Sequence, residues 1–325
     1  MKNILVIGGG GYVGTYLVDQ LIKNNYLVTV FDLFIYGNFL ENNHNLNIIK
    51  GDIRDLQLLK RIVKNFDCVI HLACISNDPS FDLNPQLGKS INFDPFEDLI
   101  KISKDEGVKR FIYASSSSVY GVKLEKDVDE TSSLEPLTDY SKYKALCEDV
   151  LLKYNDKDFT CCVVRPATVC GHSKRQRLDL VVNILTNLAY NTGEVSIYGG
   201  EQLRPNINIK DMSNAYLFLI KQPKKLISGE VFNIGFENYS VNALCDLVTK
   251  NIKHKVLIKR LKSDDNRSYH ISSKKIQKKL GFCNYYNIED AIIELINIFK
   301  KKILIDPLNN EIYFNIKRMK SLGLK

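Results

Sequence analysis

The chain has 325 residues, of which 45% are hydrophobic and 25% are charged, and its formal net charge is +8 at pH 7. This length and balance predict a globular protein of about two domains that buries its core without disulfides. The positive charge would suit nucleic acid, but no basic stripe interleaved with aromatic residues is present. We therefore expect a solvated lysine-rich surface and no nucleic-acid partner.

Membrane and metal partners are not expected either. No apolar run of about 18 residues predicts a membrane span, and the apolar stretch at the N-terminus is too short for a signal peptide. We therefore expect a cytoplasmic protein. The eight cysteines form no CxxC pair and the five histidines are scattered. This pattern predicts reduced thiols and no metal site.

The first half of the chain alternates short apolar runs with segments of helical spacing. The apolar runs predict strands at residues 4–7, 27–31, 46–50, 68–72, 110–114 and 159–164. Helices are predicted at residues 12–24, 55–64, 95–106 and 139–154. This alternation is typical of an α/β protein with a Rossmann-type, doubly wound parallel sheet, covered by helices on both faces. We assign residues 1–165 to such a domain.

The second half of the chain has a looser pattern. Helices are predicted near residues 179–191, 211–221, 240–252, 273–280 and 288–300. Short strands are predicted near residues 195–198, 231–234 and 256–260. We interpret residues 166–325 as mainly a smaller C-terminal lobe that binds the substrate. Some of its segments, including one strand, are expected to return to the Rossmann domain.

A glycine cluster follows the first predicted strand and opens a predicted helix. Such loops hold the pyrophosphate of a dinucleotide at the helix N-terminus. The predicted cofactor-binding residues of this loop are Gly8, Gly11, Tyr12, Val13 and Gly14. Asp32 ends the second strand, where a carboxylate accepts both ribose hydroxyls and repels a 2′-phosphate. No Arg or Lys directly follows it, so residues 1–165 are expected to bind NAD rather than NADP. Asp52 and Ile53 follow the third strand and would frame the adenine, unless Asp52 caps a helix.

A tyrosine and a lysine stand four residues apart in a predicted helix. At this spacing Tyr140 and Lys144 share one face. The ammonium group should then lower the pKa of the phenol from roughly 10, which would make Tyr140 a general base for an alcohol. Four serines, at residues 115–118, leave the fifth strand at its carboxyl end, where ligands bind in such sheets. One of these hydroxyls is expected to hold the oxygen that loses its proton.

The chain resembles extended short-chain dehydrogenases/reductases of the NAD-dependent epimerase/dehydratase family, which act on nucleotide sugars. The matching segments are GGGGYVG at 8–14, GDIRD at 51–55, HLA at 71–73, ASSSSVYG at 114–121, Tyr140 with Lys144, Arg165-Pro166, Gly199-Gly200 with Arg204-Pro205, and DNRSY at 265–269. Together these segments cover almost the whole chain.

The resemblance implies a role for each matching residue. Ser116, Tyr140 and Lys144 would be catalytic, with Lys144 also holding the nicotinamide ribose. Further cofactor-binding residues would be Leu72, Ala73, Asn92, Ser115 and Pro166, in addition to Asp52 and Ile53. The substrate would be bound by Ser116, Ser117, Thr168, Arg175, Arg177, Arg204 and Arg267. Thr168 departs from the Asn that many 4-epimerases have there, and each Arg could instead serve a structural ion pair.

The resemblance also implies the reaction, which begins with oxidation of the sugar at C4 to a 4-keto nucleotide sugar. A 4,6-dehydratase has an Asp-Glu pair where this chain has Ser117 and Ser118, so that outcome is not favoured. A dehydrogenase and a 4-epimerase remain open, as does a non-catalytic NAD-binding module. The segments at 75–81, 165–171, 175–180 and 264–273 are similar to a bacterial capsule-biosynthesis subgroup that oxidises a GDP-heptose. Members often form homodimers through two helices, here near residues 86–106 and 139–154.

Overall fold

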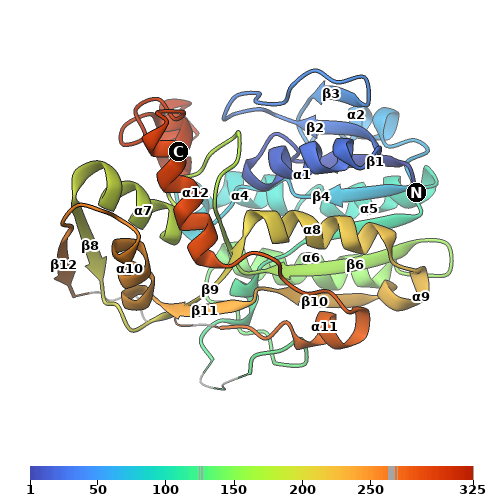
Figure 1. Cartoon of the computed structure of the whole chain (residues 1–325). Coiled ribbons are helices and arrows are strands. Elements are labelled where there is room, and N and C mark those ends of the chain that lie inside the picture. Colours follow the sequence, from blue (N-terminus) through green and yellow to red (C-terminus); the bar gives the residue numbers. More distant parts are fainter. Residues whose placement is uncertain (124, 126, 263–267, 269, 325) are drawn as a thin grey trace.

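The computed structural model describes residues 1–123, 125, 127–262, 268 and 270–324. A parallel seven-stranded sheet lies at its centre, with strand order β10-β6-β5-β4-β1-β2-β3 (Figure 1). Its strands are β1 (Asn3–Ile7), β2 (Leu27–Asp32), β3 (Leu46–Lys50), β4 (Cys68–His71), β5 (Arg110–Ala114), β6 (Thr160–Pro166) and β10 (Glu230–Ile234). The predicted doubly wound Rossmann-type sheet is confirmed.

Helices cover both faces of this sheet because successive side chains of each strand point to opposite sides. In β1, Ile4 and Val6 belong to one buried cluster, whereas Leu5 and Ile7 belong to another. The first cluster is covered by α1 (Tyr12–Lys23) and α8 (Ile209–Lys221). The second is covered by α2 (Leu56–Ile62), α5 (Phe96–Asp105) and α6 (Asp139–Lys153). The strand order reverses between β1 and β4, so ligands are expected above that point, at the carboxyl ends of the strands.

The rest of the second half forms a smaller unit with its own buried cluster. It contains a three-stranded sheet, β11-β9-β7, and a two-stranded sheet, β12-β8. Its strands are β7 (Thr168–Cys170), β8 (Glu194–Tyr198), β9 (Leu203–Asn208), β11 (Glu237–Ser240) and β12 (Leu257–Leu261). Its helices are α7 (Val181–Thr192), α10 (Val241–Lys250) and α12 (Ile288–Lys300). By contrast, β10 pairs in parallel with β6, and α8 packs on α1.

Several short elements were not expected from the sequence. They are α3 (Asp78–Phe81), α9 (Lys224–Ile227), α13 (Asn315–Ser321) and the 3₁₀ turns η1 (Ser117–Tyr120) and η2 (Glu311–Tyr313), together with β7, β9 and β11. The helix expected near residues 86–106 is instead two helices, α4 (Pro85–Asn92) and α5. Helix α11 (Lys274–Leu280) lies where a helix was expected. Elements of one or two turns bury too few apolar residues for a periodic pattern to stand out.

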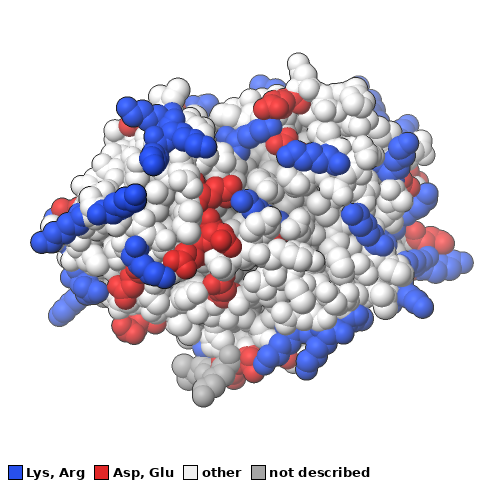
Figure 2. Space-filling view, viewed as in Figure 1, with Lys and Arg blue, Asp and Glu red and all other residues white. Residues whose placement is uncertain are grey.

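The surface and the thiols agree with an ordinary globular protein. On the face in Figure 2, Lys and Arg side chains are scattered and interrupted by acidic residues. Within the part of the chain that the structure describes, no helix has the length and apolar character needed to cross a membrane. There is also no group of three or more His, Cys, Asp or Glu side chains placed to hold a metal ion. All eight cysteines are free, and only Cys74 and Cys283 are not buried.

Candidate active site

A cavity of about 340 Å³ lies at the carboxyl ends of the central strands, within the size range of small-molecule sites. Most of the residues that the sequence predicted for the site line it. These are Gly8, Gly11, Tyr12, Val13, Gly14, Asp32, Asp52, Ile53, Leu72, Ala73, Ser115, Ser116, Ser117, Tyr140, Lys144, Pro166, Thr168, Arg175 and Arg177. The structure brings them together from both halves of the chain, and their individual roles stay predictions.

Two predicted residues, Asn92 and Arg204, do not line this cavity, and a third lies outside the described residues. Asn92 is buried behind it, where its side chain accepts from the backbone N–H of Ile75 at 2.8 Å and donates to the Ile75 carbonyl at 3.0 Å. It therefore holds a stretch of chain that lines the cavity. Arg204 lies in β9 and is absent from the lining. Arg267 lies outside the described residues.

The glycine loop has the shape that a close-approaching ligand requires. Gly8 has φ of +86°, and a Cβ there would lie 2.4 Å from the Ala73 nitrogen. A Cβ on Gly14 would lie 2.5 Å from the Gly8 carbonyl oxygen, so this glycine lets α1 start tightly against the loop itself. A Cβ on Gly11 would meet only that same oxygen within 4 Å, at 3.3 Å. The space beside the Gly11 Cα, which we call the glycine cradle, would be filled by a side chain and is open to a pyrophosphate.

Asp32 lies at the cavity end of β2, next to this loop. Its carboxylate accepts backbone N–H groups from Gly10 at 2.9 Å and from Phe34 at 2.6 Å. Burial raises the pKa of Asp32, while these two backbone donors act to lower it. The carboxylate thus stands beside the glycine cradle, where a ribose would follow, and these residues fit a dinucleotide.

Asp52 faces the same cavity but does not cap a helix. It pairs with Arg54, whose Nε and Nη2 donate to the two carboxylate oxygens at 2.9 and 2.6 Å. Hydrogen bonding to Arg54 lowers the pKa of Asp52. The cap of α2 is Asp55, which accepts from the Leu58 nitrogen at 2.9 Å.

Helix α6 presents Tyr140 and Lys144 to the cavity. A capping box starts the helix, because Thr138 and Ser141 exchange side-chain to backbone hydrogen bonds. Lys144 Nζ donates to the Ala114 carbonyl at 2.6 Å and lies 5.9 Å from the centre of the Tyr140 ring. Lys144 is thereby directed to the end of β5 rather than to the phenol oxygen.

The predicted lowering of the Tyr140 pKa is wrong for the chain by itself. Burial raises the pKa of Tyr140 well above its usual value, and the nearby Cys74 and Asp78 act in the same direction. Arg177 and the Ser116 hydroxyl act to lower it, but less strongly. The spacing of Tyr140 and Lys144 predicted a shared helix face correctly and did not reveal how deeply the phenol is buried.

The hydroxyl groups of Ser115 and Ser116, which follow β5, have different surroundings. Ser116 lines the cavity, and its hydroxyl oxygen accepts from the Ser118 backbone N–H at 3.1 Å. The Ser115 hydroxyl instead donates to Glu148, a buried carboxylate on α6. Arg165 Nη2 donates to that same carboxylate at 2.6 Å. Ser115 can therefore contribute to the cavity wall mainly through its backbone.

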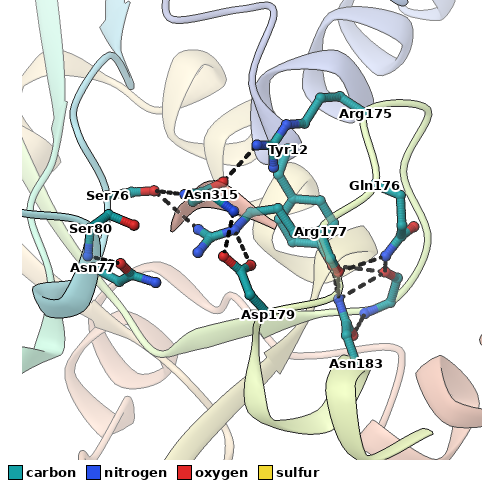
Figure 3. Close-up of polar contacts among 11 residues, drawn as sticks. Tyr12, Ser76, Asn77, Ser80, Arg175, Gln176, Arg177, Asp179, Asn183 and Asn315 are labelled. Atoms are coloured by element: carbon teal, nitrogen blue, oxygen red, sulfur yellow. Dashed lines mark hydrogen bonds and ion pairs between the residues drawn. The ribbon is translucent and has the colours of Figure 1, made fainter. Parts of the chain in front are cut away.

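The two arginines from the loop after β7 lie deep in the cavity wall (Figure 3). The Arg175 guanidinium lies 3.8 Å from the centre of the Tyr36 ring, on the Asp32 side of the cavity. Arg177 Nε donates to Asp179 at 2.8 Å and its Nη1 donates to Ser76 at 3.1 Å. Arg175 Nε and Arg177 Nη2 are buried and have no hydrogen-bond partner among the described residues. Such groups favour an anionic ligand.

A model of the NAD dependent epimerase/dehydratase family matches residues 4–235. The chain belongs to this family. It is accordingly an NAD-dependent enzyme of the short-chain dehydrogenase/reductase type, as its sequence predicted. The glycine cradle and Asp32 are the residues that would hold the cofactor.

Named relatives within the family carry out different reactions. The chain is 27% identical over 305 residues to a putative UDP-glucose 4-epimerase of Methanocaldococcus jannaschii, covering 91% of this chain and 98% of the relative. It is 28% identical over 256 residues to the dTDP-D-glucose 4,6-dehydratase of Bos taurus, covering 75% and 70%. The UDP-glucuronic acid 4-epimerase of Bacillus cereus, crystallised with UDP-glucuronic acid and NAD, superposes with a TM-score of 0.84 at 28% identity, covering 93% of this chain and 100% of that structure.

Sequence reasoning missed several residues of the cavity wall. Tyr36, Cys74, Ser76 and Asn315 all line it. Tyr36, Cys74 and Asn315 lie outside the segments on which the resemblance rested, whereas Ser76 lies within the segment 75–81 but was given no role. Asn315 lies near the C-terminus, far from any predicted site residue. Only the fold places these four side chains beside the glycine loop.

Proposed function

We propose that this enzyme oxidises C4 of a nucleotide-activated sugar to a 4-keto nucleotide sugar, using NAD. The observation that carries this proposal is the convergence of Ser116, Tyr140 and Lys144 in the same cavity as the glycine loop and Asp32. The relatives named above are enzymes of UDP- and dTDP-sugars, which supports a substrate of that class.

In the proposed reaction, Tyr140 takes the proton of the C4 hydroxyl while the C4–H bond breaks. The glycine loop and Asp32 would hold NAD, which would supply the acceptor for the hydride that leaves C4. Ser116 holds the reacting oxygen through its hydroxyl. Tyr140 must be a phenolate before it can take this proton, and the start of α6, the positive end of the helix dipole, favours that form. Lys144, fixed on the Ala114 carbonyl, keeps a positive charge in the same wall.

The finer proposal is a GDP-D-glycero-α-D-manno-heptose 4-dehydrogenase that serves bacterial surface-polysaccharide (capsule) biosynthesis. This proposal is supported by the amino-acid sequences of four segments, which are similar to that subgroup of the family. The segments are residues 75–81, 165–171, 175–180 and 264–273. Three of these segments reach the cavity, through Ser76, through Thr168, and through Arg175 with Arg177. In this reading the 4-keto product leaves the enzyme, and another acceptor must reoxidise NADH.

A second candidate is a UDP-hexose 4-epimerase, favoured by the 4-epimerases among the relatives. It would use the same residues and the same first step. The 4-keto sugar would then turn in the site and regain hydride on its other face, without net oxidation. The third alternative, a non-catalytic module, is not favoured, since the base, the lysine and the serine are all present and adjacent to one cavity.

A panel of nucleotide sugars tests the proposal. Purified enzyme is incubated with NAD and with GDP-heptose, UDP-glucose, UDP-N-acetylglucosamine or dTDP-glucose. Formation of NADH with a 4-keto product supports the dehydrogenase, and inversion at C4 without net NADH supports the epimerase. A 4-keto-6-deoxy product would identify a dehydratase and contradict both. No change in any sugar would contradict the proposed function as a whole.

We also propose a cytoplasmic homodimer that pairs through the outer faces of α4, α5 and α6. Leu146 on α6 has a relative exposure of 44%, which leaves apolar surface for a partner. Light scattering after size exclusion measures the mass directly. The mass of a monomer at micromolar concentration would contradict this proposal and leave the proposed chemistry intact.

A further inference from the structure

The last part of the described chain reaches across the molecule to the NAD cavity. After α12 it packs Leu304 and Tyr313 into a small buried cluster with Leu178. The Leu178 backbone N–H donates to the Tyr313 carbonyl at 2.9 Å. The next helix, α13, then begins at Asn315, and the family model ends far upstream, at residue 235. Helix α13 is thus anchored next to the two cavity arginines.

Asn315 connects three separate stretches of chain (Figure 3). Its side-chain oxygen accepts from Arg175 Nη2 at 2.6 Å, and its amide nitrogen donates to the Ser76 hydroxyl at 3.1 Å. Its backbone N–H donates to Asp179 at 2.9 Å. The side chain is 1% exposed, and the residue lines the NAD cavity. A neutral amide therefore fixes Arg175 directly and Arg177 through Ser76 and Asp179.

Burial of the two guanidinium groups that Asn315 fixes is unfavourable in electrostatic free energy. Arg175 is 2% exposed and Arg177 is 7% exposed, and like charges repel each other when they are desolvated together. Burial lowers the pKa of Arg175 to about 10, and the nearby Arg177 acts in the same direction. Asp179 compensates one of the two charges through its contact with Arg177. Arg175 forms no ion pair with the described residues, so its charge lies in the cavity wall on the Asp32 side.

We propose that Asn315 is a positioning residue of the NAD site, through which helix α13 holds Arg175 and Arg177 in place for the anionic diphosphate. Helix α13 therefore completes the cofactor site. This inference rests on the NAD chemistry of the proposed function but requires no particular sugar. A neutral residue suits this role because a carboxylate at position 315 would cancel the charge that the ligand needs.

The test measures NAD affinity of the purified full chain by isothermal titration calorimetry, with thermal unfolding measured in parallel. Asn315→Ala removes both side-chain contacts and should weaken NAD binding about tenfold, which corresponds to about 1.4 kcal/mol. Asn309→Ala is the matched control, since Asn309 is an exposed residue of the same C-terminal segment and does not line the cavity. It should bind NAD as the wild type does.

Asn315→Asp separates positioning from folding. It has nearly the same shape and can still accept from Arg175, so its melting temperature should equal or exceed that of the wild type. Its NAD affinity should nevertheless fall about tenfold, because the added charge neutralises a guanidinium. Wild-type NAD affinity in Asn315→Asp, or a loss of stability in Asn315→Ala without loss of affinity, would overturn the inference. Sugar turnover is scored separately, so failure of the proposed sugar chemistry would leave this result standing.

Discussion

Tyr140 is placed for base chemistry but buried in a way that opposes its ionisation. Its spacing from Lys144 identified it from the sequence, because two residues four apart on a helix face the same ligand. The burial arises from elements that are distant in sequence, including Phe81 of α3, whose ring lies 6.3 Å from that of Tyr140. The spacing in the sequence predicted that Lys144 shares a helix face with Tyr140, whereas the tertiary environment determines the direction in which the pKa of Tyr140 shifts.

Replacement of this phenol tests its role most directly. Tyr140→Phe keeps the ring packing and removes the base, so kcat for sugar oxidation should fall by about 10²- to 10⁴-fold. NAD affinity and the melting temperature should remain close to wild type. Tyr143→Phe is the matched control, because Tyr143 lies on the same helix and does not line the cavity. Full turnover in Tyr140→Phe would remove the residue from the mechanism.

The raised pKa of Tyr140 makes a second prediction, for the enzyme without ligands. A phenol whose pKa is raised stays protonated until the pH exceeds its usual value of about 10. The difference in phenolate absorbance between wild type and Tyr140→Phe should therefore stay at zero from neutral pH up to about pH 10. A difference signal that develops near neutral pH would show that the free enzyme already lowers this pKa.

At the scale of elements, a buried ion pair joins helix α6 to strand β6. Arg165 is 5% exposed and Glu148 is 2% exposed. Arg165 also donates to the Tyr120 hydroxyl at 2.8 Å, and Tyr120 donates to Asn233 of β10 at 2.7 Å. This network ties the strand that returns from the second half of the chain to the helix that carries the base. The sequence did not predict these hydrogen-bond partners, because the paired residues lie up to 113 positions apart.

Breaking this pair on one side should be costly. Glu148→Ala leaves the Arg165 charge buried and the Ser115 hydroxyl without its acceptor, so the free energy of unfolding should fall by about 3–5 kcal/mol. Chemical denaturation measures this change. Asp149→Ala, at the exposed next position of the helix, should change it by less than about 0.5 kcal/mol. Equal small effects for the two variants would mean that the ion pair contributes little.

The strands of the first half were predictable because each is a short segment in which apolar residues predominate. Ranges 4–7, 46–50 and 110–114 match β1, β3 and β5 to within a residue. Short elements such as β7 and α13 were not predictable, since three to seven residues carry no clear periodicity. Their positions come from tertiary pairing, as when Thr168 of β7 pairs with Asn206 of β9.

At the scale of the whole molecule, the sequence motifs predicted the cavity wall formed by the first half of the chain better than the wall formed by the second half. The glycine loop, Asp32 and Tyr140 follow strands or open helices of a known pattern, so their convergence could be anticipated. The opposite wall depends on how the second half folds back. There the sequence indicated Arg175 as a substrate ligand but not its stacking on Tyr36 near Asp32. Asn315 had no local signal at all.

The burial of the cysteines predicts which thiols of the folded enzyme react with a maleimide. Burial raises the pKa of Cys68, Cys147 and Cys161 to about 12, which keeps them unreactive. Cys283 is exposed and Cys74 is partly exposed on the cavity wall. A maleimide should therefore attach rapidly at Cys283 and more slowly at Cys74, and saturating NAD should suppress the second adduct alone in intact-mass spectra. Adducts on further cysteines of the native protein would contradict this arrangement, whereas the expected pattern would give a direct readout of cofactor occupancy that needs no knowledge of the sugar.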